Sequence, residues 1–284
     1  MISYIYRYTK FTQQQGAVME EQTIQQPQSQ KPQFPSEVIT LPSEGKYYHS
    51  ESPLASGTIE LYYPSARSED ILTSKNLITK GVVIDKFLES LVVDPRVNLD
   101  EMLVGDKNAL IVASRILAYG KDYKADITCP SCNEAREVTI DLSNIGTKAV
   151  TLPETNVGNT GFEVTLPASK AVVRFRLVTN GDEKQIDSEM KAMKKIVKTS
   201  TDPEITTRLK YAIISVDGNT DRTFIKRFVD NMLSIDSLEL RKALVKNTPD
   251  VDMKFEYECS ECGHTERMIL PLGVSFFWPS SQVE

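Results

Sequence analysis

The sequence predicts an α+β protein in which two β-hairpins, each carrying a cysteine pair, flank an inserted helical region. Apolar residues alternate with period two in some segments, which indicates strands, and repeat every 3.6 residues in others, which indicates helices. Two Cys-x-x-Cys pairs of identical spacing, at 129–132 and 259–262, each lie between two predicted strands. The chain has 284 residues, 40% of them hydrophobic, so it can bury a sizeable core.

The first of five predicted parts is a disordered tail at residues 1–36. Gln and Pro dominate it, so it has little apolar surface to offset the entropy of ordering. A tail that orders only on a partner is the alternative. Met19 also resembles an ordinary start, which would make residues 1–18 an upstream extension. The other predicted parts are strand and helices at 37–120, a first cysteine hairpin with a β region at 121–182, a helical insertion at 183–248, and a second cysteine hairpin with an aromatic C-terminus at 249–284.

The part at 37–120 is predicted to contain one strand followed by helices. Order is expected to begin near Val38. Ser68 is expected to cap the first helix, at 68–72, because its side chain can accept hydrogen bonds from exposed helix amides. Asp106 is expected to cap the last helix and Gly120 to end it. The expected elements are a strand at 57–63 and helices at 68–72, 84–91 and 106–118.

Beyond the first hairpin, alternation predicts two antiparallel strands and then a charged helical region. One of its helices carries a row of lysines, which is either a solvated face or a patch for an acidic partner. These lysines are Lys191, Lys194, Lys195 and Lys198. The expected elements are strands at 162–166 and 172–178, helices at 183–198, 203–214, 220–232 and 237–246, and strands at 252–258 and 267–270.

The four cysteines of the chain predict one structural Zn²⁺ site. A Cys-x-x-Cys turn places two sulfurs on one side, and two such turns supply the four thiolates of a closed tetrahedral site. Asn133 and Gly263, which follow the second cysteine of each turn, are residue types that tolerate positive φ. The 126 residues between the pairs then form an insertion in a split, zinc-ribbon-like pair of hairpins. Redox cysteines, a disulfide and metal-free knuckles are the alternatives. The predicted ligands are Cys129, Cys132, Cys259 and Cys262.

Little else in the sequence has the composition of a catalytic or polyanion-binding site. Four thiolates leave no open metal position for substrate, and no Gly-rich phosphate loop occurs. His264 is expected to be an exposed loop residue, with ligand replacement as the alternative, and His49 has no partner by sequence. The net charge is −6 and would be about −8 with zinc bound, which disfavours nucleic acid. We therefore predict a protein that is not an enzyme.

The termini carry the remaining signals. No apolar run of about 18 residues is present, so no membrane span is predicted. The first ten residues lack the features of a secretory signal, which favours a reducing compartment. At the other end, Phe276, Phe277 and Trp278 are consecutive aromatics. They are either the closing edge of the core or a plug for a neighbouring subunit.

Several short motifs follow one another along residues 38–280. They are Leu41-Pro-Ser-Glu-Gly-Lys-Tyr-Tyr48, Gly57-Thr-Ile-Glu-Leu61, Ser68-Glu-Asp-Ile-Leu72, Gly105-Asp-Lys-Asn-Ala109, Arg115-Ile-Leu-Ala-Tyr-Gly120 and Cys129-Pro-Ser-Cys132. In this order they resemble the baseplate hub proteins of T4-like contractile-tailed bacteriophages.

The resemblance implies a structural component of the tail baseplate hub, without enzyme activity, located in the virion and assembled in the host cytoplasm. Other baseplate and tail proteins would be its partners in a multi-copy symmetric assembly. A hub assembly chaperone absent from the mature virion is the alternative, and a zinc-ribbon nucleic-acid binder ranks below both. Around the cysteines, acidic residues outnumber Arg136 and Arg267, against a nucleic-acid role.

Overall fold

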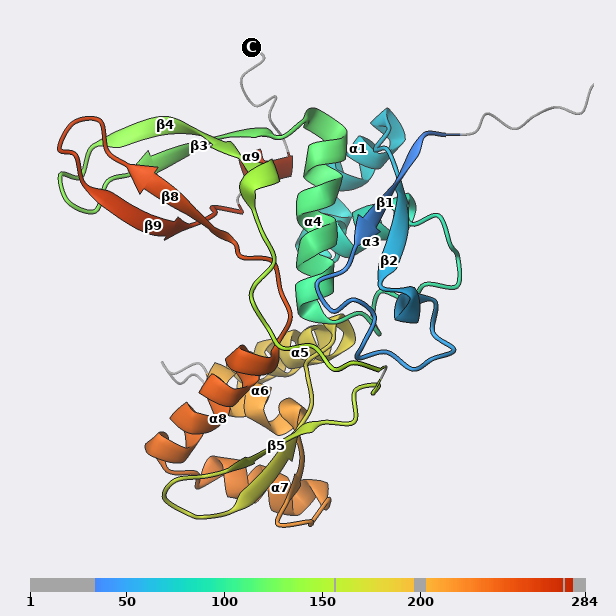
Figure 1. The fold of residues 1–284 in the computed structure, drawn as a ribbon, viewed down its shortest axis with the longest axis vertical. Helices are drawn as coiled ribbons and strands as arrows, with labels where there is room; N and C mark the ends of the chain where they lie inside the picture. The colour runs from blue at the N-terminus through green and yellow to red at the C-terminus, as the bar shows by residue number, and fades with distance from the viewer. Residues whose placement is uncertain (1–33, 156, 197–202, 273, 278–284) are drawn as a thin grey trace, which may run out of the picture. The chain divides into compact units, whose positions relative to one another are not determined.

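The computed structural model describes residues 34–155, 157–196, 203–272 and 274–277. Helices and small antiparallel sheets alternate along this part of the chain, which confirms the α+β class (Figure 1). The tail predicted at 1–36 lies outside the described residues except for its last three. Of these, Ser36 begins strand β1 (Ser36–Thr40).

The N-terminal part packs a two-stranded sheet against helices. β1 pairs antiparallel with β2 (Thr58–Tyr62), and Ile39 lies opposite Ile59. Buried residues such as Leu61, Phe87 and Leu110 form one hydrophobic cluster between this sheet and the helices. The helices are α1 (Ala66–Thr73), α2 (Lys75–Lys80), α3 (Val83–Leu91) and α4 (Val104–Tyr119), and a 3₁₀ turn, η1 (Pro53–Ser56), precedes β2.

Two predicted helix caps are wrong, and one is confirmed. Ser65 is the N-cap of α1, and Ser68 lies in the first turn, where its hydroxyl accepts from the Ser65 N–H at 3.3 Å. α4 begins two residues before Asp106, which is buried in its first turn instead of capping it. Gly120 ends α4 as predicted, with φ of 82°.

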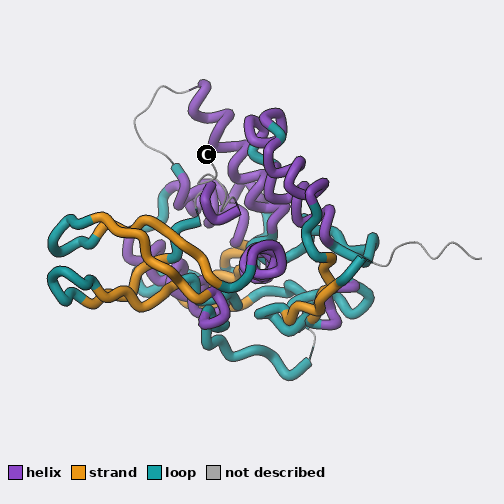
Figure 2. The backbone as a smooth tube through the Cα atoms, turned by 90° about the horizontal axis from the view of Figure 1, so that it is seen from above, coloured by secondary structure: helices purple, strands orange, loops and turns teal. Residues whose placement is uncertain are grey.

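Two β-hairpins lie side by side and enclose a second hydrophobic cluster (Figures 1 and 2). In the first hairpin, alternate residues Tyr123, Ala125 and Ile127 are buried, as expected for a strand covered on one face. Tyr257 and Leu270 contribute from the second hairpin. The strands are β3 (Asp122–Thr128) with β4 (Ala135–Asp141), followed by η2 (Leu142–Asn144), and β8 (Lys254–Glu258) with β9 (Thr265–Ile269).

The segment between the hairpins folds around a third cluster, which includes Phe175, Ile213 and Leu240. The helix predicted at 203–214 ends at Ala212, because its last two residues begin strand β7 (Ile213–Val216). Its buried Ile213 and Val216 pair with β6, so burial against the sheet overrides the helical period. The other elements are β5 (Phe162–Thr165), β6 (Val172–Phe175), α5 (Asn180–Ile196), α6 (Glu204–Ala212), α7 (Arg222–Asp230) and α8 (Ser234–Asn247).

The chain leaves the first hairpin and returns to the second at one place. Thr147 and Val251 form an antiparallel bridge, and the Lys148 N–H donates to the Asp250 carbonyl at 2.8 Å. The Asp252 N–H donates to the Gly146 carbonyl at 2.8 Å. The segment between these points is therefore an excursion whose two ends lie together, the arrangement that tolerates inserted segments.

Candidate metal centre

The two cysteine turns have the same backbone hydrogen-bond pattern. In the first, the Cys129 N–H donates to the Glu134 carbonyl and the Asn133 N–H donates to the Cys129 carbonyl, both at 2.9 Å. In the second, the Cys259 N–H donates to the His264 carbonyl and the Gly263 N–H donates to the Cys259 carbonyl, also at 2.9 Å. Asn133 and Gly263 have φ of 58° and 67°, so the prediction of positive φ at these positions is confirmed. Each turn thus presents its two sulfurs on the same side.

The two turns bring all four sulfurs together. Every pair of sulfurs lies within 4.8 Å, and Cys129 Sγ–Cys262 Sγ and Cys132 Sγ–Cys259 Sγ are both 3.7 Å. Four ligands at about 2.3 Å from a tetrahedral Zn²⁺ lie about 3.8 Å apart. A disulfide requires a sulfur–sulfur distance of about 2.05 Å. The donor set therefore fits one thiolate-bound metal ion and does not fit a disulfide.

The backbone of each turn polarises its first cysteine. The N–H of Cys262, followed by that of Glu261, lowers the pKa of Cys259 to about 6. The N–H of Cys132 likewise lowers the pKa of Cys129. The N–H of Glu134 lowers the pKa of Cys132, but partial desolvation of its sulfur and the neighbouring cysteines raise it to about 12. Four thiolates this close repel one another, so their full ionisation requires a cation between them.

The walls of the centre join the two hairpins. Cys129 and Cys259 are buried, whereas Cys132 and Cys262 are exposed. Arg136 on β4 crosses to the second turn, where its guanidinium donates to the Ser260 hydroxyl and the Glu261 carboxylate. These contacts, together with the shared cluster below them, align the two turns independently of the sulfurs.

Neither histidine belongs to the sulfur cluster. His264 is partly exposed, and its Nε2 lies 3.3 Å from a carboxylate oxygen of Glu266. This agrees with the prediction of a loop histidine. His49 is exposed, and its Nδ1 accepts from the Glu51 N–H at 3.4 Å. Within the part of the chain that the structure describes, the four cysteines are the group of side chains with metal-ligand geometry.

A buried polar network was not predicted from the sequence. The Asp106 carboxylate accepts from the Ser43 N–H at 2.9 Å, the Ser43 hydroxyl at 2.6 Å and the Tyr48 hydroxyl at 2.5 Å. Tyr48 in turn accepts from the Leu103 N–H at 2.9 Å. Burial raises the pKa of Asp106 and of Tyr48. The network joins two of the motifs quoted above, those at 41–48 and 105–109, and its role is to fix α4 against the N-terminal loop.

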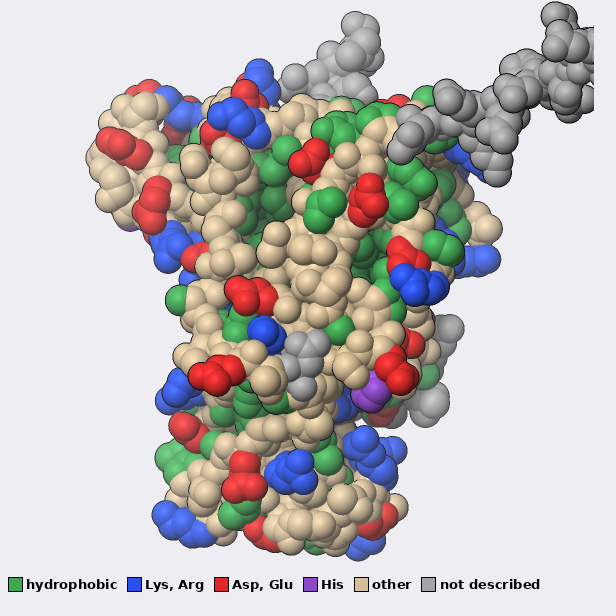
Figure 3. All heavy atoms as spheres, turned by 45° about the vertical axis from the view of Figure 1, so that its right-hand side comes forward, with side chains coloured by type: hydrophobic (Ala, Val, Ile, Leu, Met, Phe, Trp, Pro, Cys, Tyr) green, Lys and Arg blue, Asp and Glu red, His purple; other side chains and the backbone are tan. Residues whose placement is uncertain are grey.

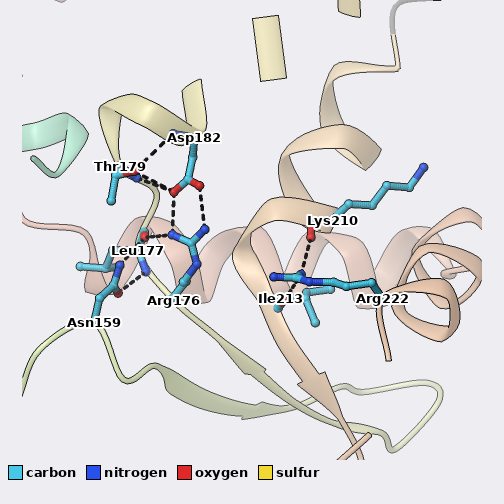
Figure 4. A network of polar contacts seen from close by, with 8 residues as sticks. All are labelled: Asn159, Arg176, Leu177, Thr179, Asp182, Lys210, Ile213 and Arg222. Carbon is cyan, nitrogen blue, oxygen red and sulfur yellow. Dashed lines mark hydrogen bonds and ion pairs between the residues drawn. The ribbon is translucent and has the colours of Figure 1, made fainter. Parts of the chain in front are cut away.

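A second polar network attaches α5 to the sheet of the inserted segment. In Figure 4 the Arg176 guanidinium faces Asp182, with Nη–Oδ distances of 2.6 and 2.7 Å, and Asp182 also accepts from Thr179. Arg222 donates to the backbone carbonyls of Lys210 and Ile213 at the end of α6. These partners are structural, because each side chain holds an element end.

The C-terminal aromatics close the core. Phe276, in α9 (Val274–Phe277), is fully buried, and its ring centroid lies 5.1 Å from that of Tyr123. Phe277 packs 5.8 Å from Phe87 and joins the first two hydrophobic clusters. The structure therefore favours the core edge over the plug for these two residues. Trp278 lies outside the described residues.

The remaining predictions concern membrane-spanning segments and the distribution of charge on the surface. Among the described residues, no helix combines the length and apolarity needed to cross a bilayer. Lys191 and Lys194 on α5 are exposed, whereas the side chain of Lys195 and all of Lys198 lie outside the described part. On the face drawn in Figure 3, side chains of both charges are interspersed.

The fold and the site define an α+β protein with a candidate structural metal centre at the tips of two hairpins. The model of the family described as T4 bacteriophage base plate protein matches residues 38–278. The match covers most of the chain, so this chain belongs to the T4 bacteriophage base plate protein family. Searches of curated proteins and of solved structures gave no match.

Proposed function

We propose that the chain is a non-enzymatic structural component of a contractile phage tail baseplate, in its hub region, organised by one four-thiolate Zn²⁺ site. Family membership supports the baseplate role. The observation that carries the zinc assignment is the 3.7 Å spacing of sulfurs from opposite hairpins. Cys129, Cys132, Cys259 and Cys262 would be its ligands, and other baseplate proteins its partners in a symmetric virion assembly.

When bound, a divalent cation would cross-link the two hairpins and leave no position for substrate. The chain's own residues would hold the sulfurs in position. The turn amides orient the sulfurs, Arg136 ties the turns together, and the buried cluster excludes water from one side. Zinc binding to small thiolate sites contributes on the order of 10 kcal/mol. That exceeds the cost of closing a loop of this length, about 5 kcal/mol.

Metal analysis of purified protein tests the zinc assignment. Plasma mass spectrometry should find about one zinc per chain, and replacing Cys129 and Cys132 together with Ser should remove it and lower stability. Ser131→Ala changes the same turn without changing a ligand, and it is expected to keep the metal. A wild-type protein without stoichiometric metal, or a double-serine variant of unchanged stability, would contradict the clamp.

Mass spectrometry of purified virions tests the baseplate role. Stoichiometric copies would support a structural subunit. Absence from mature virions, with co-purification from infected cells with other tail proteins, would instead indicate an assembly factor.

Nucleic-acid binding is not favoured. Glu134 and Glu258 flank the turns, and the main cation there, Arg136, already pairs with Glu261.

A further inference from the structure

Helix α8 presents apolar side chains on the side facing away from the core. Leu240 is buried and Leu244 partly buried in the cluster of the inserted segment. On the opposite side, Ile235, Leu238 and Val245 are 57%, 43% and 63% exposed. Successive helical residues are about 100° apart, so positions 238 and 240 point in nearly opposite directions. α8 therefore has two apolar faces, and only one of them packs against other described residues.

The exposed residues have the spacing by which helices pair. Leu238 and Val245 follow Ile235 by three and ten residues, and Lys242 follows it by seven. These are the a and d positions of two consecutive heptads, with a β-branched residue at the first a and Leu at the first d. Such a seam accepts the side chains of a facing helix into the spaces between its own. The spacing therefore indicates a helical partner.

Cations lie in and beside this seam. Lys242 occupies its second a position, Arg241 and Lys246 lie beside it, and all three are exposed. Of the two carboxylates of α8, Glu239 is partly exposed and Asp236 is buried. Lys242 Nζ is 4.0 Å from Glu239, and Arg241 and Lys246 have no carboxylate partner among the described residues. A second copy of α8 would bring like charges together, whereas a helix with acidic flanks would match them. The charge therefore selects an acidic partner helix over a second copy.

We propose that the outward face of α8, formed by Ile235, Leu238, Lys242 and Val245, binds an amphipathic helix with acidic flanks on another protein of the assembly. This inference rests on the proposed structural role, because it names the surface by which the chain would join its neighbours. It does not depend on the metal, which the test leaves unchanged.

The test uses a labelled 21-residue helical peptide of three heptads, with Ile at a, Leu at d, and Glu at e and g. Its acidic flanks prevent self-pairing. Controls are the same peptide with Lys at e and g, and a scrambled Glu peptide of identical composition. Fluorescence anisotropy with full-length, metal-replete protein should show saturable binding of the Glu peptide alone, weakening as salt is raised. Equal binding of all three peptides, or no binding, would overturn the proposal.

Two variants identify the surface. Leu238→Gln with Val245→Gln should weaken binding at least about tenfold, the ratio for losing one buried apolar side chain. Val38→Thr, which alters an equally exposed residue on β1, should leave binding unchanged. Replacing Arg241, Lys242 and Lys246 with Glu should transfer the preference to the Lys peptide. Unchanged binding in either α8 variant, with folding verified by circular dichroism, would refute the assignment.

Sedimentation velocity and vesicle flotation test two other occupants. Wild-type protein should be monomeric at micromolar concentration. A dimer lost in the Leu238→Gln, Val245→Gln variant would make the occupant a second copy. Flotation with phosphatidylserine vesicles, lost in the same variant, would make it a lipid surface. Either result overturns the acidic-helix proposal. Neither affects the metal analysis or the virion composition, so this inference and the proposed function fail separately.

Discussion

Replacing Asp106 with Ala removes three hydrogen bonds from the buried network at the start of α4. The donors are the Ser43 N–H, the Ser43 hydroxyl and the Tyr48 hydroxyl, and Ser43 and Tyr48 are both buried. A buried donor left without an acceptor costs about 1–3 kcal/mol. Removing the buried carboxylate also recovers part of its desolvation cost. We expect a net loss of about 3 kcal/mol in the free energy of unfolding.

Urea unfolding followed by far-ultraviolet circular dichroism measures this loss. Asp106→Asn keeps one acceptor oxygen for the Ser43 N–H and should lose about 1 kcal/mol. Asp70→Ala, an exposed carboxylate on α1, is the matched control and should change stability by less than about 0.5 kcal/mol. If Asp106→Ala lies within about 0.5 kcal/mol of wild type at an unchanged urea dependence, the network does not hold α4.

The difference in stability between wild type and Asp106→Asn should depend on pH in one direction. Burial raises the pKa of Asp106, and the hydrogen bonds from Ser43 and Tyr48 only partly oppose it. A carboxyl with a raised folded-state pKa is destabilising when ionised, and its protonation restores stability as pH falls through that pKa. The gain is complete below the unfolded-state value of about 3.9. The stability of wild type relative to Asp106→Asn should therefore increase from pH 7 to about pH 4.5. A constant or shrinking difference would contradict the raised pKa.

Three further substitutions test other contacts by the same unfolding assay. Gly105→Ala places a Cβ 1.9 Å from the Pro249 carbonyl oxygen, so it should cost about 2–3 kcal/mol, and a neutral result would mean that the segment at 249–250 moves freely. Phe276→Ala leaves a cavity at a fully buried site beside Tyr123 and should lower the free energy of unfolding by about 3–4 kcal/mol. A loss below about 1 kcal/mol would instead favour the alternative, in which the C-terminal aromatics insert into a neighbouring subunit. Arg136→Ala removes a partly exposed ion pair and should cost less than about 1 kcal/mol with zinc content unchanged, whereas metal loss would make Arg136 part of the site.

The cysteine turns could be predicted because their chemistry is local. A Cys-x-x-Cys pair that is followed by a residue type tolerating positive φ defines a turn. This can be seen without knowledge of the rest of the chain. The flanking alternation then places each turn at a hairpin tip. That the pairs meet across 126 residues followed only from the coordination number of zinc, and the 4.8 Å limit on the sulfur distances agrees with it.

The cap at Asp106 was wrong for a reason that applies to other carboxylates in this chain. An Asp near a helix start can accept from its own first turn or from a distant segment, and local sequence does not distinguish the two. Asp106 accepts from Ser43, 63 residues away, and Asp236 at the start of α8 accepts from the Ala168 and Ser169 amides. In both cases the carboxylate connects segments whose contact was not predicted from the sequence.

The same long-range contacts bear on how the cysteine halves find each other. The inserted segment leaves and returns through paired backbone at Lys148 and Asp250, and Asn108 on α4 donates to the Asp250 carboxylate at 3.0 Å. Gly105 allows α4 to approach this crossing, because any side chain there would strike the Pro249 carbonyl. The crossing therefore brings the two hairpins together before any cation is considered. A metal ion at the tips would act at the far end of this junction and would add rigidity to the two hairpins.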